Sequence, residues 1–145
     1  MINDAYTYVD TGDKTTFIFH SEGPQGIITK FIEFTFEEDG TWNLGFGDWR
    51  NGDIDGAIIT NNHDAMRVIR TVAKATLDFF NTYPKRVVVI EAIDEKRNRL
   101  YNSVFKRHFK DIEPVFDIIG IVGNLRETYS PEKYYQRFEL KLKLI

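Results

Sequence analysis

The sequence contains no cysteine, and this absence alone removes several classes of function. Disulfide scaffolds, thiolate nucleophiles, zinc ribbons and thiolate-bound clusters all require that residue. No apolar run approaches the roughly 20 residues that cross a bilayer, and the start, MINDAYTYVD, lacks the basic and apolar regions of a signal peptide. We therefore expect a soluble cytoplasmic protein with no membrane contact, since a chain without disulfides suits a reducing compartment.

Motifs for catalysis and metal binding are missing as well. His20, His63 and His108 are scattered without paired spacing, and the sequence has neither a nucleophile elbow nor a P-loop. Residues 51–56, NGDIDG, match the first half of a calcium loop, but Asn62 stands where a bidentate Glu belongs, and an ordinary turn explains the segment as well. The sequence predicts no cofactor and no metal, and it leaves open whether the protein is an enzyme.

What the sequence does have is enough length and apolar content for one packed domain. Its 145 residues are 42% hydrophobic and include 12 Phe and 7 Tyr, large side chains that need burial. Without a linker or repeat, residues 1–145 are expected to form a single domain. Charge is unevenly divided, because residues 1–60 hold 11 acids and 3 bases whereas residues 61–145 hold 11 acids and 16 bases. This division indicates a basic binding face, or attraction between the halves within the fold or across a homo-oligomer.

Hydrophobic periodicity predicts an α+β domain with a mixed, largely antiparallel sheet and two packed helices. Helical spacing of apolar residues indicates helices over 62–82, capped by Asn61 or Asn62 and stopped by Pro84, and over 94–110. Strands are expected at 15–20, 27–36, 41–47, 57–60, 86–93, 114–122 and from Tyr134 onward. The predicted order is β-β-β-(β)-α-β-α-β-β. Glycines in the third strand suggest a close approach by backbone or ligand.

The second helix and the apolar strand before it, 86–93, carry the clearest functional signal. Six Lys or Arg residues fall between Lys96 and Lys110. Projected as a wheel, one third of the helix carries a single polar row: Lys96, Arg99, Ser103, Lys106, Arg107 and Lys110. A row of cations repels itself unless an anion lies nearby, which phosphate, a nucleotide or the acidic half of the chain would supply. A solvated helix face without a partner is the alternative.

Arg97 and His108 interrupt the apolar side of the same helix. A guanidinium facing the core needs a partner, because burying an unpaired charge costs several kcal/mol (order of magnitude). Glu91, near the carboxyl end of the buried strand, is the expected partner, and ligands often bind at such ends. Arg97 then binds an anion with Tyr101 one turn further on, or the pair is purely structural. The predicted binding residues are Glu91, Arg97, Arg99, Tyr101, Lys106, Arg107 and Lys110.

Four aromatic residues near the end of the chain offer a further possibility: Tyr129, Tyr134, Tyr135 and Phe138. Together with nearby Arg126, Lys133 and Arg137, such rings are able to stack nucleic-acid bases. Their spacing is nevertheless more typical of core and edge positions of strands.

Residues 61–110, with RNRLYNSVF near their end, resemble a family of small uncharacterised bacterial proteins. That family carries an Arg-x-Arg-Leu-Tyr motif after a buried strand. Four residues match the motif: Arg97, Arg99, Leu100 and Tyr101. The turn 92–94 departs from the family's Gly-Ser-Thr, which argues against an anion-cradling role for this turn. The resemblance covers about half the chain and implies no activity.

A second likeness is to the acetyltransferase fold that uses acetyl coenzyme A. That fold holds pyrophosphate with a glycine-containing loop, whereas the corresponding residues 60–65 contain no glycine. The first prediction is therefore a small non-enzymatic binding domain whose basic helix faces an anionic partner, either nucleic acid or an acidic protein surface. The alternative is an enzyme of acyltransferase-like fold with a divergent acyl-CoA or nucleotide pocket near Glu91, Arg97 and Tyr101.

Overall fold

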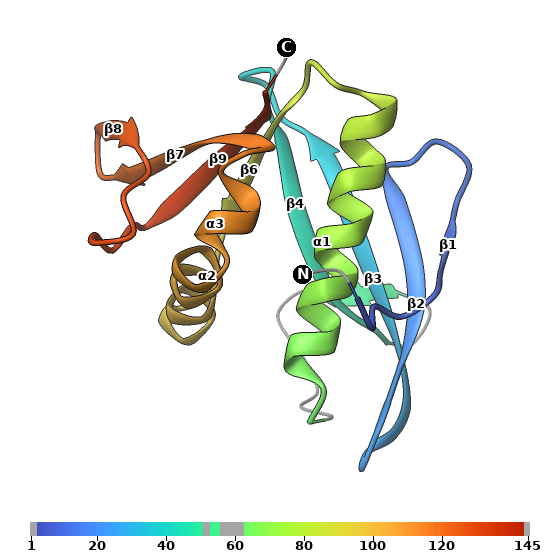
Figure 1. Ribbon diagram of the computed structural model, residues 1–145. Helices are drawn as coiled ribbons and strands as arrows, with labels where there is room; N and C mark the ends of the chain where they lie inside the picture. The colour runs from blue at the N-terminus through green and yellow to red at the C-terminus, as the bar shows by residue number, and fades with distance from the viewer. Residues whose placement is uncertain (1–2, 51–52, 56–62, 144–145) are drawn as a thin grey trace. The chain divides into compact units, whose positions relative to one another are not determined.

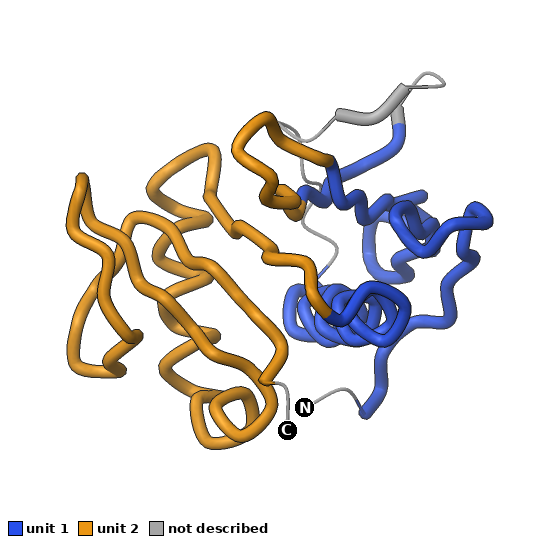
Figure 2. Tube along the Cα trace, turned by 90° about the horizontal axis from the view of Figure 1, so that it is seen from above, with its two compact units in different colours: residues 1–35, 45–84 blue, residues 36–44, 85–145 orange. Residues whose placement is uncertain are grey.

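The computed structural model describes residues 3–50, 53–55 and 63–143. It confirms the α+β class and the mixed sheet, because β4 and β6 pair in parallel while the other recorded pairs are antiparallel. The chain divides into two compact units, residues 1–35 with 45–84 and residues 36–44 with 85–145 (Figure 2). The single domain stays a prediction, because this division does not measure whether either unit unfolds by itself.

The first unit is a set of paired strands with one long helix. Its elements are β1 (Tyr8–Asp10), β2 (Thr16–Gly23), β3 (Gly26–Phe36), β4 (Trp42–Arg50), β5 (Asp53–Asp55) and α1 (Ala65–Thr82). The strands neighbour one another in the order β1-β2-β3-β4, and β5 pairs with β4. Residue 36 of β3 and residues 42–44 of β4 belong to the second unit. Helix α1 lies along the strands of its own unit (Figure 1), where the ring of Phe79 stacks on that of Phe34 at 4.1 Å.

The N-terminal segment covers a side of α1 that the periodicity assigns to solvent. Thr71 is fully buried because the backbone N–H of Tyr6 donates to its Oγ1 atom at 2.9 Å. The Arg67 guanidinium lies 3.8 Å from the centroid of the Tyr6 ring. Strand β1, which the sequence pattern does not predict, continues this segment and pairs with β2. The buried stripe of α1 is therefore wider than its own apolar residues indicate.

The start of α1 differs from the prediction. The helix begins at Ala65 after the N-cap residue Asp64, rather than at residue 62. The Asp64 carboxylate accepts hydrogen bonds from Tyr6 Oη at 2.6 Å and Ser21 Oγ at 2.5 Å instead of capping the helix. The expected strand 57–60, the expected caps at 61–62 and all but residues 53–55 of the calcium-like segment lie outside the described residues.

The second unit contains the strand and helix that carry the functional signal. Its further elements are β6 (Val87–Glu91), α2 (Glu95–Arg107), α3 (Phe109–Ile112), β7 (Phe116–Val122), β8 (Leu125–Thr128) and β9 (Arg137–Leu142). The strand order is β4-β6-β9-β7-β8. The predicted second helix ends three residues early, because the backbone closes α2 at His108 and starts the short α3. Strand β8 was not predicted; residues 123 and 124 form the turn that joins it to β7.

Strand β6 lies between β4 and β9 but is less buried than its apolar sequence predicts. Val88 is fully buried, whereas its neighbours Val87 and Val89 are half-buried and Glu91 is exposed. Helix α2 packs on β9 through the rings of Phe105 and Phe138, whose centroids lie 4.3 Å apart. Among the described residues, no helix is long and apolar enough to cross a membrane.

Candidate functional site

Helix α2 and the start of α3 present an exposed group of cations that we call the basic surface. It consists of Lys96, Arg99, Lys106, Arg107 and Lys110, all of them exposed. At 100° per residue the four cations on α2 fall within an arc of roughly 100°, as the sequence predicts. Asp94 caps the helix by accepting from the backbone N–H of Arg97 at 2.8 Å. The opposite side of the helix is buried, so this surface faces away from the core.

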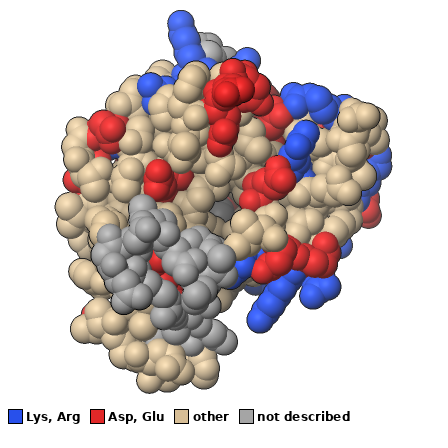
Figure 3. Space-filling view, turned by 180° about the vertical axis from the view of Figure 1, so that it is seen from behind, with Lys and Arg blue, Asp and Glu red and all other residues tan. Residues whose placement is uncertain are grey.

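Most cations elsewhere in the described chain are neutralised by a nearby carboxylate. These ion pairs are Lys14–Asp10, Lys30–Asp48, Arg67–Asp4, Arg70–Asp4, Arg97–Asp94, Arg126–Glu139, Lys133–Glu127, Arg137–Glu91 and Lys143–Glu113. In Figure 3, acidic and basic side chains accordingly lie interspersed over much of the visible face. For the basic surface, in contrast, the described residues provide no ion pair. Outside it, Lys85 and Lys141 likewise have neither an ion pair with the described residues nor an aromatic ring beneath them.

The predicted pair of Glu91 with Arg97 is wrong. Arg97 Nη1 lies 2.6 Å from Asp94 Oδ2, and its side chain is 18% exposed, so it is largely buried as expected. Glu91 is exposed and lies 3.8 Å from Arg137. The reason is local geometry: Glu91 and Arg137 are direct neighbours across β6 and β9, while Asp94 is one helical turn before Arg97. The spacing Asp-x-x-Arg was the signal in the sequence.

Tyr101 lies beside this Asp94–Arg97 pair and is half-buried. Burial raises the pKa of its phenol to about 12, with a further increase from Asp94 and an opposing decrease from Arg97. At neutral pH the side chain is therefore a neutral phenol. Its hydroxyl is able to donate a hydrogen bond but not to act as a base.

A titration of tyrosine absorbance to high pH should contain a component near pH 12 that is lost in Tyr101→Phe. The unfolded chain loses this proton near pH 10, as free tyrosine does. The contribution of Tyr101 to the free energy of unfolding is therefore complete below pH 10 and falls as the pH rises towards 12. The wild-type minus Tyr101→Phe difference spectrum isolates this residue from the other tyrosines. A midpoint near 10 in that difference would show an exposed phenol.

Two asparagines on the buried side of α2 anchor a neighbouring segment of the chain, a role that the sequence analysis missed. Asn102 makes two bonds at 2.9 Å to the main chain of Tyr135, accepting from its N–H and donating to its C=O. Asn98 donates to the same carbonyl at 3.0 Å and to the hydroxyl of Tyr134 at 3.3 Å. The pair fixes residues 134–135 against the helix. The signal in the sequence was the four-residue spacing of Asn98 and Asn102, which places both polar side chains on the inner side of α2.

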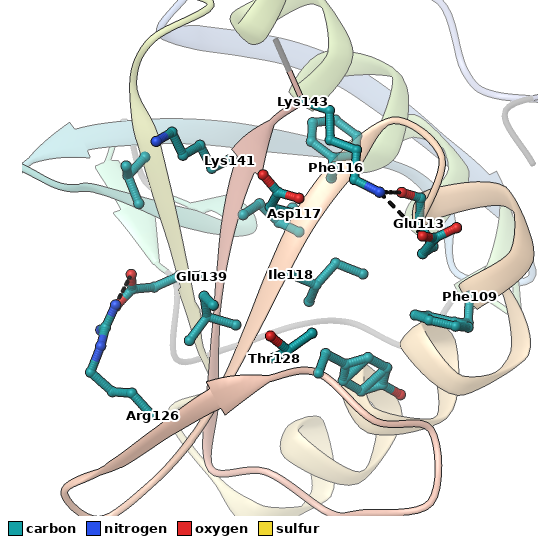
Figure 4. Close-up of a pocket in the computed structure, with 14 residues that line it drawn as sticks. Phe109, Glu113, Phe116, Asp117, Ile118, Arg126, Thr128, Glu139, Lys141 and Lys143 are labelled. Carbon is teal, nitrogen blue, oxygen red and sulfur yellow. Dashed lines mark hydrogen bonds and ion pairs between the residues drawn. The ribbon is translucent and has the colours of Figure 1, made fainter. Parts of the chain in front are cut away.

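A cavity of about 570 Å³ lies in the second unit between α3 and strands β7 to β9 (Figure 4). Phe109, Ile118 and Tyr129 contribute apolar surface to it. Its charged side chains largely neutralise one another, through Lys143 with Glu113 and Arg126 with Glu139. None of the predicted binding residues lines this cavity. Its balanced charge does not favour an anion over a cation.

No group of three potential metal-ligating side chains occurs within residues 3–50, 53–55 and 63–143. The exposed side chains of α2 are mainly cations. They do not form the nucleophile and base pairs that are typical of hydrolases. The exposed cations of α2 are able to attract negative charge.

Comparison with known protein families gives a match over nearly the whole chain. Residues 3–143 match DUF6934, described as a family of unknown function. The chain belongs to the family DUF6934. Membership in a family of uncharacterised proteins is thereby confirmed, whereas the Arg-x-Arg-Leu-Tyr motif and the acetyltransferase likeness stay predictions. No curated protein and no solved structure matches this DUF6934 chain.

Proposed function

We propose that this DUF6934 protein is a non-enzymatic domain that binds nucleic acid through the basic surface of α2 and α3. The observation that carries the proposal is the contrast in charge pairing. Outside the basic surface the described chain neutralises most of its cations by ion pairs, whereas the five cations of the basic surface are exposed and make no ion pair with the described residues. Repulsion within such a row disfavours folding slightly, and an anionic partner removes that cost.

The shape of the surface favours a phosphate backbone over an acidic protein. From Lys96 to Lys106 the helix rises about 15 Å, so the cations form a row along which several phosphates are able to bind. Protein interfaces usually have a buried apolar centre and few lysines. The large apolar side chains that are exposed in the described chain all lie outside α2. Contacts to phosphate need no such centre.

Replacing three cations of the basic surface should weaken binding of oligonucleotides and lower its salt dependence. The variant is Lys106→Gln, Arg107→Gln, Lys110→Gln. Each lost phosphate contact reduces the slope of log K against log salt by about 0.7 to 0.9, so the triple change should reduce it by roughly 2 to 3. Fluorescence anisotropy of a labelled oligonucleotide in a salt series measures both quantities.

A matched triple removes the same charge elsewhere: Lys74→Gln, Lys85→Gln, Lys141→Gln. All three of its lysines are exposed and lie outside α2 and α3. This control should keep the wild-type slope. If both triple variants lose the same oligonucleotide affinity and the same salt slope, the effect comes from net charge alone, which contradicts the proposed surface. If the protein binds an acidic protein but no oligonucleotide, the partner of the basic surface is an acidic protein and the nucleic-acid proposal is wrong.

The proposal includes a cytoplasmic location, which the absence of cysteine supports. The acyltransferase alternative has less support, because the cavity of the second unit contains neither Glu91, Arg97 nor Tyr101. A rise in melting temperature with coenzyme A that persists in the basic-surface triple would favour that alternative.

A further inference from the structure

One exposed aromatic ring stands beside the basic surface. Tyr134 is 49% exposed, whereas its aromatic neighbours Tyr129, Tyr135 and Phe138 are buried. The four rings look equivalent in the sequence, but the structure leaves only Tyr134 with a large open surface. A tyrosine ring on the outside of a protein has little effect on stability, and it offers a flat apolar face to a partner.

The position of Tyr134 is fixed by α2. Its hydroxyl donates to Glu95 Oε1 and accepts from Asn98 Nδ2, so the ring is held at the first turn of the helix. The following residue, Tyr135, is tied by its main chain to Asn98 and Asn102. One anchor holds the hydroxyl of Tyr134 and the other holds the main chain beside it, and the residue stays 49% exposed. A partner therefore meets a pre-organised ring, which reduces the entropy lost on binding.

Tyr134 borders the row of cations. On the helix wheel its partner Glu95 lies about 40° from Arg99. The bond to Glu95 raises the pKa of Tyr134, and the positive charge of Arg99, one helical turn after Glu95, lowers it. An aromatic platform and a cationic track are thus adjacent on one surface. This is the combination by which proteins hold unpaired nucleotides.

We infer that the basic surface takes single-stranded nucleic acid, with one base stacked on Tyr134 and the following phosphates on Arg99, Lys106 and Lys110. This inference rests on the proposed function and specifies its substrate class. Duplex bases are stacked on one another and do not present a face to a side chain on the surface of a helix. Single strands have free faces, and every base is able to stack, so little sequence preference is expected.

The test compares three probes of about 12 nucleotides, a length within the usual range of site sizes. They are a single-stranded thymidine oligomer, the same backbone without bases, and the thymidine oligomer in a duplex with its complement. Wild-type protein should bind the single strand more tightly than the other two. In Tyr134→Ser that preference for bases should fall by roughly 5- to 150-fold, the effect of losing one stacked base, while affinity for the abasic strand stays the same.

Two further variants separate stacking from folding. Tyr134→Phe keeps the ring but loses the bonds to Glu95 and Asn98, and it should keep most of the preference. Phe36→Ser removes a ring that is exposed on β3, away from α2, and should change nothing. Melting curves establish that each variant is folded.

The outcomes distinguish the two proposals. Equal binding of the thymidine and abasic strands by the wild type, or equal losses for both probes in Tyr134→Ser, would overturn the single-strand inference and leave the proposed function intact. Failure of all three probes to bind even at low salt would overturn the proposed function, and the inference with it.

Discussion

Replacing Lys30 with Met should lower the free energy of unfolding by about 3–5 kcal/mol, which is typical when one partner of a buried ion pair is removed. The ammonium of Lys30 lies 2.5 Å from Asp48 Oδ1, and the two side chains are 2% and 0% exposed. They come from the neighbouring strands β3 and β4. Without the ammonium the buried carboxylate loses a charged hydrogen-bond partner that water does not replace. Chemical denaturation of the two proteins measures the difference.

The double variant Lys30→Met, Asp48→Leu separates pairing from packing. The double variant leaves neither charge of the pair buried, so its loss of free energy of unfolding should be clearly smaller than the sum of the losses in Lys30→Met and Asp48→Leu. Lys14→Met serves as the control, because it breaks a partly exposed pair with Asp10 at 3.2 Å and should change the free energy of unfolding by less than about 1 kcal/mol. If Lys30→Met costs no more than Lys14→Met, the pair does not hold β3 and β4 together.

Gly120→Ala should lower the free energy of unfolding by about 3 kcal/mol. A Cβ atom at this position in β7 would lie 2.4 Å from two ring carbons of Tyr135. That ring cannot move aside easily, since it is 1% exposed and its main chain is bonded to Asn102. Overpacking of this kind usually costs 1–3 kcal/mol, occasionally more. Denaturation curves report the change.

Gly45→Ala provides the matched control. Gly45 also lies within a strand, but the nearest atom to its added Cβ is the Glu33 carbonyl oxygen at 4.0 Å, an ordinary contact. The free energy of unfolding of Gly45→Ala should differ from that of the wild type by less than about 1 kcal/mol. Combining Gly120→Ala with Tyr135→Leu should cost less than the two changes added together, because the smaller side chain makes room for the methyl group. Additive losses would mean that the ring is not what excludes a side chain at position 120.

The candidate site was predictable in part. The exposure of Arg99, Lys106 and Arg107 follows from helical periodicity, because a 100° step per residue places them on one side whatever surrounds the helix. The partner of Arg97 was not found, since a buried guanidinium requires some carboxylate but does not specify which one. Asp94, on the same helix, is closer than Glu91 on the strand.

The role of Tyr134 also depended on the fold. Nothing in the spacing of the aromatic residues separates it from Tyr135, which is buried one residue later. What separates them is the pair Asn98 and Asn102, which binds the main chain here and turns one ring inward and the other outward. Contacts between residues more than 30 positions apart carry no local pattern in the sequence.

By itself the sequence determined the α+β class, the two main helices, most of the strands and the row of cations on α2. These features depend on side-chain periodicity and on turn residues, which act over a few neighbouring positions. Only the tertiary structure decided that Lys30 meets Asp48, that the ring of Tyr135 lies on Gly120 and that the ring of Tyr134 stands beside the cations. The physical reason is that packing and charge pairing act between segments distant in the chain, where many partners satisfy the same local pattern and only the folded arrangement selects one.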